Sequence, residues 1–148
     1  MGSTRMSNYI IAAVPISLIE VLWDRVSPIL QRVVDVSHKE ISLESVKRDT
    51  LSGNTLLVAI CKGKEIVAVN TIEINTLASG LKVLFVPVTG GDELDGWMDQ
   101  FLEVAEAIGK EHGCQEIRGI AARRGWLRKL KDQGWQEYNV AIGKVIGE

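Results

Sequence analysis

The stretch from residue 81 to residue 135 constrains the fold of this chain more than any other part. Residues 81–88 are apolar and β-branched and predict a strand, which the turn at 89–92 ends. Residues 95–112 carry apolar side chains at helical spacing, and residues 115–121 predict a second strand. Strand, glycine turn, helix and strand form a crossover unit, which is right-handed with its helix packed on the sheet.

The N-terminal part of the chain predicts helices. Apolar residues recur at three- and four-residue spacing over 18–34. Pro28 lies inside this stripe with Ser27 as a candidate N-cap, so we expect a kink or two short helices. Ser42 is the expected N-cap of a further helix that ends near Gly53.

The middle of the chain predicts a β-hairpin. Residues 55–61 and 65–74 are β-branched and apolar, and the loop between them contains Gly63. The strand at 81–88 is expected to pair on as a third strand. Pro87 cannot donate a ladder hydrogen bond, so this strand should lose a neighbour or bulge there.

The C-terminal third predicts a long helix, a short helix and a closing strand. Asp92 or Asp95 is the expected N-cap of the helix at 95–112, and Gly113 its end. Residues 124–133 predict a helix with a basic outer face. Residues 136–146 predict a last strand, whose apolar side would carry Tyr138, Val140 and Ile142.

Composition sets the broad class of the protein. A chain of 148 residues suits one domain, which we place at 9–148, with 1–8 as a disordered N-terminus or a cloning remnant. A net charge of −2 gives no general attraction to nucleic acid or to an anionic membrane. Cys61 and Cys114 are interpreted as core residues of a protein from a reducing compartment. No metal-ligand spacing or membrane-spanning stretch is present, which favours the cytoplasm.

The order of elements, together with the C-terminal motifs, resembles the GNAT superfamily of N-acetyltransferases. The motifs are Gly113-Cys114, then residues 124–128 (Arg-Gly-Trp-Leu-Arg), then Gly134-Trp135 and a last strand with Lys144. They are similar to those of GNAT-like proteins of tailed bacteriophages, which would place the chain in the host cytoplasm or the virion. The resemblance implies a single α/β domain with a mixed, mostly antiparallel sheet flanked by helices. Its central strands would separate beside Pro87 to admit the pantetheine arm of an acyl-CoA.

The resemblance also implies a binding site for acetyl-CoA. Main-chain amides near Val86 and Val88 would hold the thioester carbonyl. The turn at 89–91 would hold the pyrophosphate, with arginines nearby; the residues are Thr89, Gly90, Gly91, Arg123 and Arg124. Three carboxylates crowd this turn, and a carboxylate about 4 Å from a phosphate costs on the order of 1–4 kcal/mol near a surface. A capped helix behind a tight turn is the alternative interpretation of the two glycines.

The sequence indicates the catalytic residues less clearly than the binding site for acetyl-CoA. Many members of the superfamily carry a tyrosine, which protonates the leaving thiolate, four residues before the final Gly-aromatic pair; here that position is Leu130. Glu73 is the candidate base, and an exposed strand residue is its alternative interpretation. Two functions therefore remain open: an acyl-CoA-dependent N-acyltransferase acting on an amine, or a catalytically inactive phage accessory or virion-associated protein. The partner would be an amine acceptor, another protein or a second copy of the chain.

Overall fold

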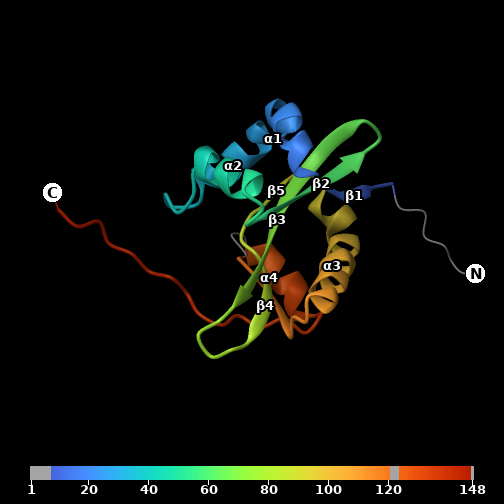
Figure 1. Cartoon of the computed structure of the whole chain (residues 1–148). Helices are drawn as coiled ribbons and strands as arrows, with labels where there is room; N and C mark the ends of the chain where they lie inside the picture. Colours follow the sequence, from blue (N-terminus) through green and yellow to red (C-terminus); the bar gives the residue numbers. More distant parts are fainter. Residues whose placement is uncertain (1–7, 121–123, 148) are drawn as a thin grey trace, which may run out of the picture.

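The computed structural model describes residues 8–120 and 124–147 (Figure 1). The predicted N-terminal segment 1–8 lies outside these residues except for Asn8. In chain order the elements are β1 (Ile10–Ala13), α1 (Ile16–Asp35), α2 (Leu43–Leu51), β2 (Leu56–Lys62), β3 (Glu65–Thr76), β4 (Lys82–Val86), β5 (Thr89–Gly91), α3 (Leu94–Glu111), β6 (Glu116–Gly119) and α4 (Arg124–Lys131).

The sheet is mixed and mostly antiparallel, as predicted. Its strand order is β1-β2-β3-β4-β6, and β5 pairs with β3 off this path. The β2–β3 pair is the expected hairpin, and β4 adds to β3 in antiparallel register. Among the described strands, β4 and β6 alone run parallel, and the crossover through α3 joins them.

Two hydrophobic clusters cover the two faces of the sheet. Helices α1 and α2 pack on one face, where Ile19, Val26 and Leu30 of α1 are at most 1% exposed. Helix α3 packs on the other face, and its Trp97 and Phe101 rings meet edge to face at 6.1 Å between centroids. Figure 1 shows α1 and α2 on one side of β3 and α3 and α4 on the other.

The strand that begins as β4 bulges at Pro87, as the sequence predicted. Glu73 of β3 lies opposite Phe85, whereas Asn70 lies opposite Thr89. Two residues of β3 therefore face three residues of the other strand, 86–88, which is the extra residue of a β-bulge. After this bulge the chain continues along β3 as β5.

The first helix corrects one of the two alternatives expected at Pro28. α1 is a single helix of 20 residues with Pro28 inside it, so two short helices are excluded and a kink stays a prediction. Proline removes one helical hydrogen bond, but the buried stripe on both sides of it holds the helix against the sheet. By contrast, Ser42 caps α2 as predicted: its hydroxyl accepts from the Ser45 amide at 3.0 Å.

The start of α3 corrects a second prediction. Neither Asp92 nor Asp95 is its N-cap; that position is Glu93, which adopts a left-handed backbone with φ of 59° and makes no side-chain cap. The Asp92 carbonyl instead accepts a hydrogen bond from the Trp97 indole at 2.8 Å. The carboxylates of Asp92 and Asp95 form ion pairs with basic side chains instead of capping the helix. Gly113 follows the helix end with φ of 74°, as expected.

Both ends of the described chain differ from the prediction. Strand β1, which pairs with β2, was missed. The closing strand predicted over 136–146 does not form: these residues follow α4 as an extended segment without strand pairing. Their alternating pattern suits a strand, but a strand also needs a partner, and this segment pairs with no strand of the described chain.

Cys61 and Cys114 are both half-buried free thiols that pack against the two clusters. Across residues 8–120 and 124–147, no helix is long and apolar enough to cross a bilayer.

Candidate functional site

The central strands separate where the bulge begins. β4 and β6 are paired up to Val86 and Gly119, and beyond that point β5 has only β3 as a partner among the described strands. The predicted separation beside Pro87 is therefore confirmed. The Val88 carbonyl accepts from the Thr71 amide at 3.0 Å, but the Val88 N–H has no acceptor in the described part of the chain. Within the described residues this main-chain donor is unpaired, and it lies two residues beyond the last β4–β6 pair, Val86–Gly119.

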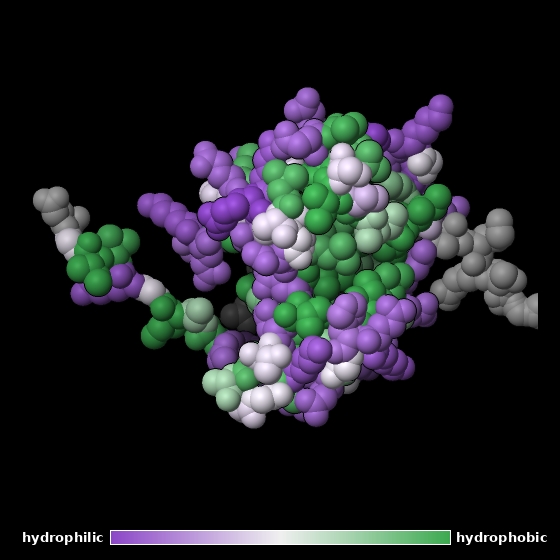
Figure 2. All heavy atoms as spheres, in the orientation of Figure 1, coloured by the Kyte–Doolittle hydropathy of each residue, from purple (hydrophilic) through white to green (hydrophobic). Residues whose placement is uncertain are grey.

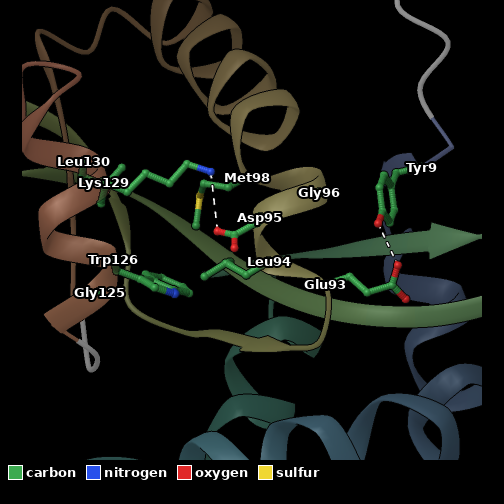
Figure 3. Close-up of a pocket in the computed structure, with 10 residues that line it drawn as sticks. All are labelled: Tyr9, Glu93, Leu94, Asp95, Gly96, Met98, Gly125, Trp126, Lys129 and Leu130. Carbon is green, nitrogen blue, oxygen red and sulfur yellow. Dashed lines mark hydrogen bonds and ion pairs between the residues drawn. The ribbon is translucent and has the colours of Figure 1, made fainter.

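A cleft of about 670 Å³ lies between the start of α3 and helix α4. Figure 3 shows Trp126 and Leu94 facing each other across it, with Lys129 reaching over from α4 towards Asp95. Its walls are mostly apolar, with charged groups at the rim; the helical lining residues are Leu94, Asp95, Gly96, Met98, Gly125, Trp126, Lys129 and Leu130. The cleft can hold an amphipathic ligand.

The carboxylates of the turn before α3 are all ion-paired, and their partners come from distant parts of the sequence. The pairs are Asp92–Arg32 of α1 (3.2 Å), Glu93–Lys62 of β2 (3.0 Å) and Asp95–Lys129 of α4 (3.7 Å). The side chains remain partly exposed, so each pair adds little to stability. Their effect is to offset the negative charge that would repel an anion at this helix start.

Tyr9 covers the first turn of α3. Its hydroxyl donates to Glu93 Oε1 at 2.7 Å, and a Cβ on Gly96 would lie 2.5 Å from that hydroxyl oxygen. The hydrogen bond from Tyr9, followed by that from Lys62, lowers the pKa of Glu93. The same contacts with Glu93 raise the pKa of Tyr9 and of Lys62. Gly96 is therefore needed for the close approach of the ring to the helix.

The two glycines predicted to hold a pyrophosphate lie in β5, paired with β3. A Cβ on Gly90 would lie 2.4 Å from Val33 Cγ2 of α1. A Cβ on Gly91, which has φ of 121°, would lie 2.4 Å from Ala68 Cα. Close packing against α1 and β3 thus accounts for both glycines. Their role in phosphate binding, and that of Thr89, stays a prediction.

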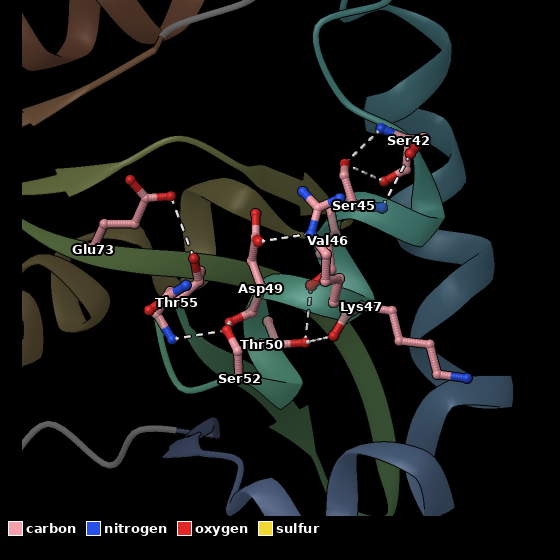
Figure 4. A network of polar contacts seen from close by, with 11 residues as sticks. Ser42, Ser45, Val46, Lys47, Asp49, Thr50, Ser52, Thr55 and Glu73 are labelled. Atoms are coloured by element: carbon pink, nitrogen blue, oxygen red, sulfur yellow. Dashed lines mark hydrogen bonds and ion pairs between the residues drawn. The ribbon is translucent and has the colours of Figure 1, made fainter.

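Glu73 lies next to the opening, on the face of the sheet opposite α3. It pairs with Phe85, one residue before the separation, and it follows Ile72, whose side chain is in the α3-side cluster. The glutamate is half-buried rather than exposed, and its Oε2 accepts from the Thr55 hydroxyl at 3.3 Å (Figure 4). Thr55 is in turn held by the Asp49 carbonyl at the end of α2.

The described residues place no tyrosine at the expected acid position. Leu130 lines the cleft and is 9% exposed. Tyr138 donates to Glu116 Oε1 at 2.7 Å, and the Arg118 guanidinium lies 4.8 Å from its ring. The hydrogen bond to Glu116 raises the pKa of Tyr138. Because Glu116 begins β6 and Gly119 ends it, Tyr138 lies about 10 Å along the strand from the opening.

The two arginines predicted to bind the pyrophosphate lie in or next to residues 121–123, which the structure does not describe. Arg123 lies outside the described residues, and Arg124 begins α4 with its side chain outside them. Arg32 and Lys62 at the acidic turn were not predicted, whereas Lys129 belongs to the basic face expected of the helix at 124–133. No local sequence signal marks Arg32 or Lys62, because they reach the turn only through the packing of α1 and β2. Among the described residues, no cluster of His, Cys, Asp and Glu could hold a metal ion.

Solved structures share this arrangement of elements. An aminoglycoside acetyltransferase from an uncultured soil metagenomic sample, in complex with trehalose, is 11% identical with a TM-score of 0.70, over 95% of this chain and 97% of that one. A predicted acetyltransferase with acetyl-CoA from Clostridium acetobutylicum is 13% identical with a TM-score of 0.67, over 93% and 96%. A GNAT family acetyltransferase from Staphylococcus aureus is 13% identical with a TM-score of 0.65, over 95% and 100%.

At these identities the likeness concerns the fold alone, and the chain has the GNAT fold. No protein-family model and no curated protein matches the sequence.

Proposed function

We propose that this protein is an acyl-CoA-dependent N-acyltransferase that transfers acetyl from acetyl-CoA to an amine of a protein or small molecule. The observation that carries the proposal is the combination of the α3–α4 cleft with the end of the β4–β6 ladder. The cleft between α3 and α4 lies on the face of the sheet that α3 covers, and the ladder of β4 and β6 ends at Val86, two residues before Val88, whose N–H has no acceptor among the described residues. Solved acetyltransferases with the same fold support the choice of reaction.

The cleft suits the parts of a CoA molecule. In the first turn of α3 the Gly96 amide donates to the Glu93 carbonyl at 2.8 Å, whereas the Leu94 and Asp95 amides have no acceptor among the described residues. These two amides favour an anion, here the pyrophosphate. The ion pairs of the acidic turn reduce the repulsion that its carboxylates would otherwise exert. Trp126 and Leu94 offer apolar surface, and Lys129 is a cation within reach of phosphate oxygens.

The reaction would proceed by direct attack. Bound acetyl-CoA supplies a thioester whose carbonyl carbon accepts the amine nitrogen. The Val88 N–H would donate to the oxygen on which negative charge develops. Glu73, on the opposite face, would accept the amine proton. As the carbon–nitrogen bond forms, the carbon–sulfur bond breaks. Since Leu130 occupies the usual acid position, the thiolate would take its proton from water.

A second candidate function is a GNAT-like protein without catalysis, such as a phage accessory or virion-associated protein. Leu130 in place of an acid favours it. The two candidates differ in whether acetyl-CoA binds and is turned over.

Thermal unfolding with and without acetyl-CoA tests the proposal. A ligand at about 100 times its dissociation constant adds about 2.7 kcal/mol to the free energy of unfolding, so the midpoint should rise. Release of free CoA thiol in the presence of an amine panel then reports turnover. An unchanged midpoint at saturating acetyl-CoA would leave only the non-catalytic function.

A further inference from the structure

The segment after α4 is apolar, alternating and exposed. We call residues 136–147 the C-terminal tail. Its Ile142, Val145 and Ile146 are 95%, 85% and 97% exposed, and Val140 is 72% exposed. Figure 2 shows these apolar residues standing away from the body of the molecule at the left. Single exposed apolar residues are common on protein surfaces, but a contiguous run of this kind marks an interaction site.

Strand β6 offers a matching acceptor. It pairs with β4 on one side, and no described strand lies on its other side. The edge of a sheet carries unpaired N–H and C=O groups that can accept a further strand. Ile117 of β6 packs against the α3-side cluster, and Ile120 just after it is 50% exposed. An added strand with one apolar face would extend this surface.

The tail does not use the β6 edge of its own chain. Its contact with β6 is made by the side chain of Tyr138, which meets Glu116 and Arg118. Beyond Tyr138 the tail leaves the body and ends far from it (Figure 1). Tyr138 thus fixes the start of the tail beside β6 while the remaining residues point outward.

We propose that the tail adds as a strand to the β6 edge of a second copy of this chain, which adds its own tail in return. A second copy is the partner because this chain carries both the donor and the acceptor. Tyr138 places the start of the donor next to the acceptor edge. A two-fold axis beside β6 would therefore form both exchanges together and close the assembly as a dimer. This inference is independent of acyl transfer.

Sedimentation velocity of the full chain across a dilution series tests this dimer. The wild-type protein should sediment as a dimer, and Ile142→Asp should weaken association by about 100-fold or more because it places a charge in the added strand. Val21→Asp is the matched control, since Val21 is 71% exposed on α1, away from the tail. A monomer at all concentrations, or a dimer insensitive to Ile142→Asp, would overturn the proposal.

Cross-linking distinguishes exchange between copies from pairing within one chain. One variant carries Ile142→Cys and the other Ile120→Cys, both with Cys61 and Cys114 replaced by serine. When the two are mixed and treated with a short bismaleimide, the proposal predicts a cross-linked dimer containing one chain of each. A double variant carries both Ile142→Cys and Ile120→Cys in one chain. If the mixture yields no such dimer, or if the double variant cross-links only within its own chain, the proposal fails.

Discussion

At the scale of single residues, the turn before α3 shows how distant side chains decide whether an anion can approach a helix start. The three carboxylates of the turn would repel a phosphate by on the order of 1–4 kcal/mol each at about 4 Å. Arg32, Lys62 and Lys129 each lie within 4.0 Å of one carboxylate and offset that charge. The turn is therefore close to neutral, and the helix amides keep their attraction for an anion.

The position of Glu73 predicts a catalytic effect. Glu73→Gln keeps the shape of the side chain but removes the base, so turnover should fall by about 10²–10⁴-fold while binding of acetyl-CoA is unchanged. Steady-state kinetics with acetyl-CoA and an amine measures the turnover of both proteins. Glu65→Gln, at the exposed start of the same strand, is the control. Equal activity of Glu73→Gln and wild type would remove Glu73 from the mechanism.

The Tyr9–Glu93–Lys62 contacts predict a pH dependence of stability. Hydrogen bonds from Tyr9 and Lys62 lower the pKa of Glu93 in the folded state. A lowered folded pKa adds stability above the unfolded pKa, and this stability is lost as the pH falls through the folded value. The midpoints of wild type and Glu93→Gln should therefore differ at neutral pH and converge in acid. Glu103→Gln, at an exposed position of α3, is the control for the loss of a carboxylate. A difference between wild type and Glu93→Gln that stays constant through the acid range would contradict this account.

Gly91 predicts a large stability effect. Gly91→Ala would place a Cβ 2.4 Å from the backbone of β3 at a φ of 121°, so it should lower the free energy of unfolding by about 2–4 kcal/mol. Gly125→Ala adds the same atom in α4, where nothing lies within 4 Å, and should be neutral or stabilising. Chemical denaturation compares the two. Equal stability of both variants would show that the strand contact tolerates a side chain.

At the scale of elements, helix α2 supports the candidate base. Ser42 and Ser45 form reciprocal hydrogen bonds at its start, and Asp49 near its end holds the Thr55 amide at 3.1 Å (Figure 4). Thr55 then donates to Glu73. The orientation of the carboxylate thus depends on the helix that precedes β2.

Loss of the α2 cap should therefore act on both stability and activity. Ser42→Ala should lower the free energy of unfolding by about 1 kcal/mol. Ser17→Ala, at an exposed position of α1, serves as the control and should change little. Denaturation curves measure the stability of the two variants, and the rate of CoA thiol release measures their activity. A Ser42→Ala protein as stable as the control would show that the capping box is not needed.

The same element scale shows what the sequence could and could not predict. Local signals were sufficient for the Ser42 cap, the β2–β3 hairpin and the bulge at Pro87, because each depends on neighbours in the chain. The continuous α1 helix, the Arg32 and Lys62 ion pairs and the unpaired tail depend on tertiary packing instead. Glu73 was found from its place on a strand, but its contact with Thr55 required the fold.

At the scale of the whole molecule, the sheet has two unlike halves. Strands β1, β2 and β3 are covered by helices and paired along most of their length, whereas β4 and β6 separate after a short ladder. Among the described residues, the unpaired Val88 N–H and the uncovered β6 edge belong to the second half, and the cleft lies between the two helices α3 and α4. The first half thus has the more extensive strand pairing, and the proposed thioester site lies where the ladder of the second half ends.

The central claim is that acyl-CoA binds in the α3–α4 cleft with its thioester at the opening. Titration of the isotope-labelled protein with CoA, followed by amide and indole NMR signals, tests it most directly. We predict saturable shifts at Val88, Leu94 and Asp95 and at the Trp126 indole, with the exposed control Gly80 unchanged. Saturable shifts confined to other surfaces, or none at all with folded protein, would contradict the account.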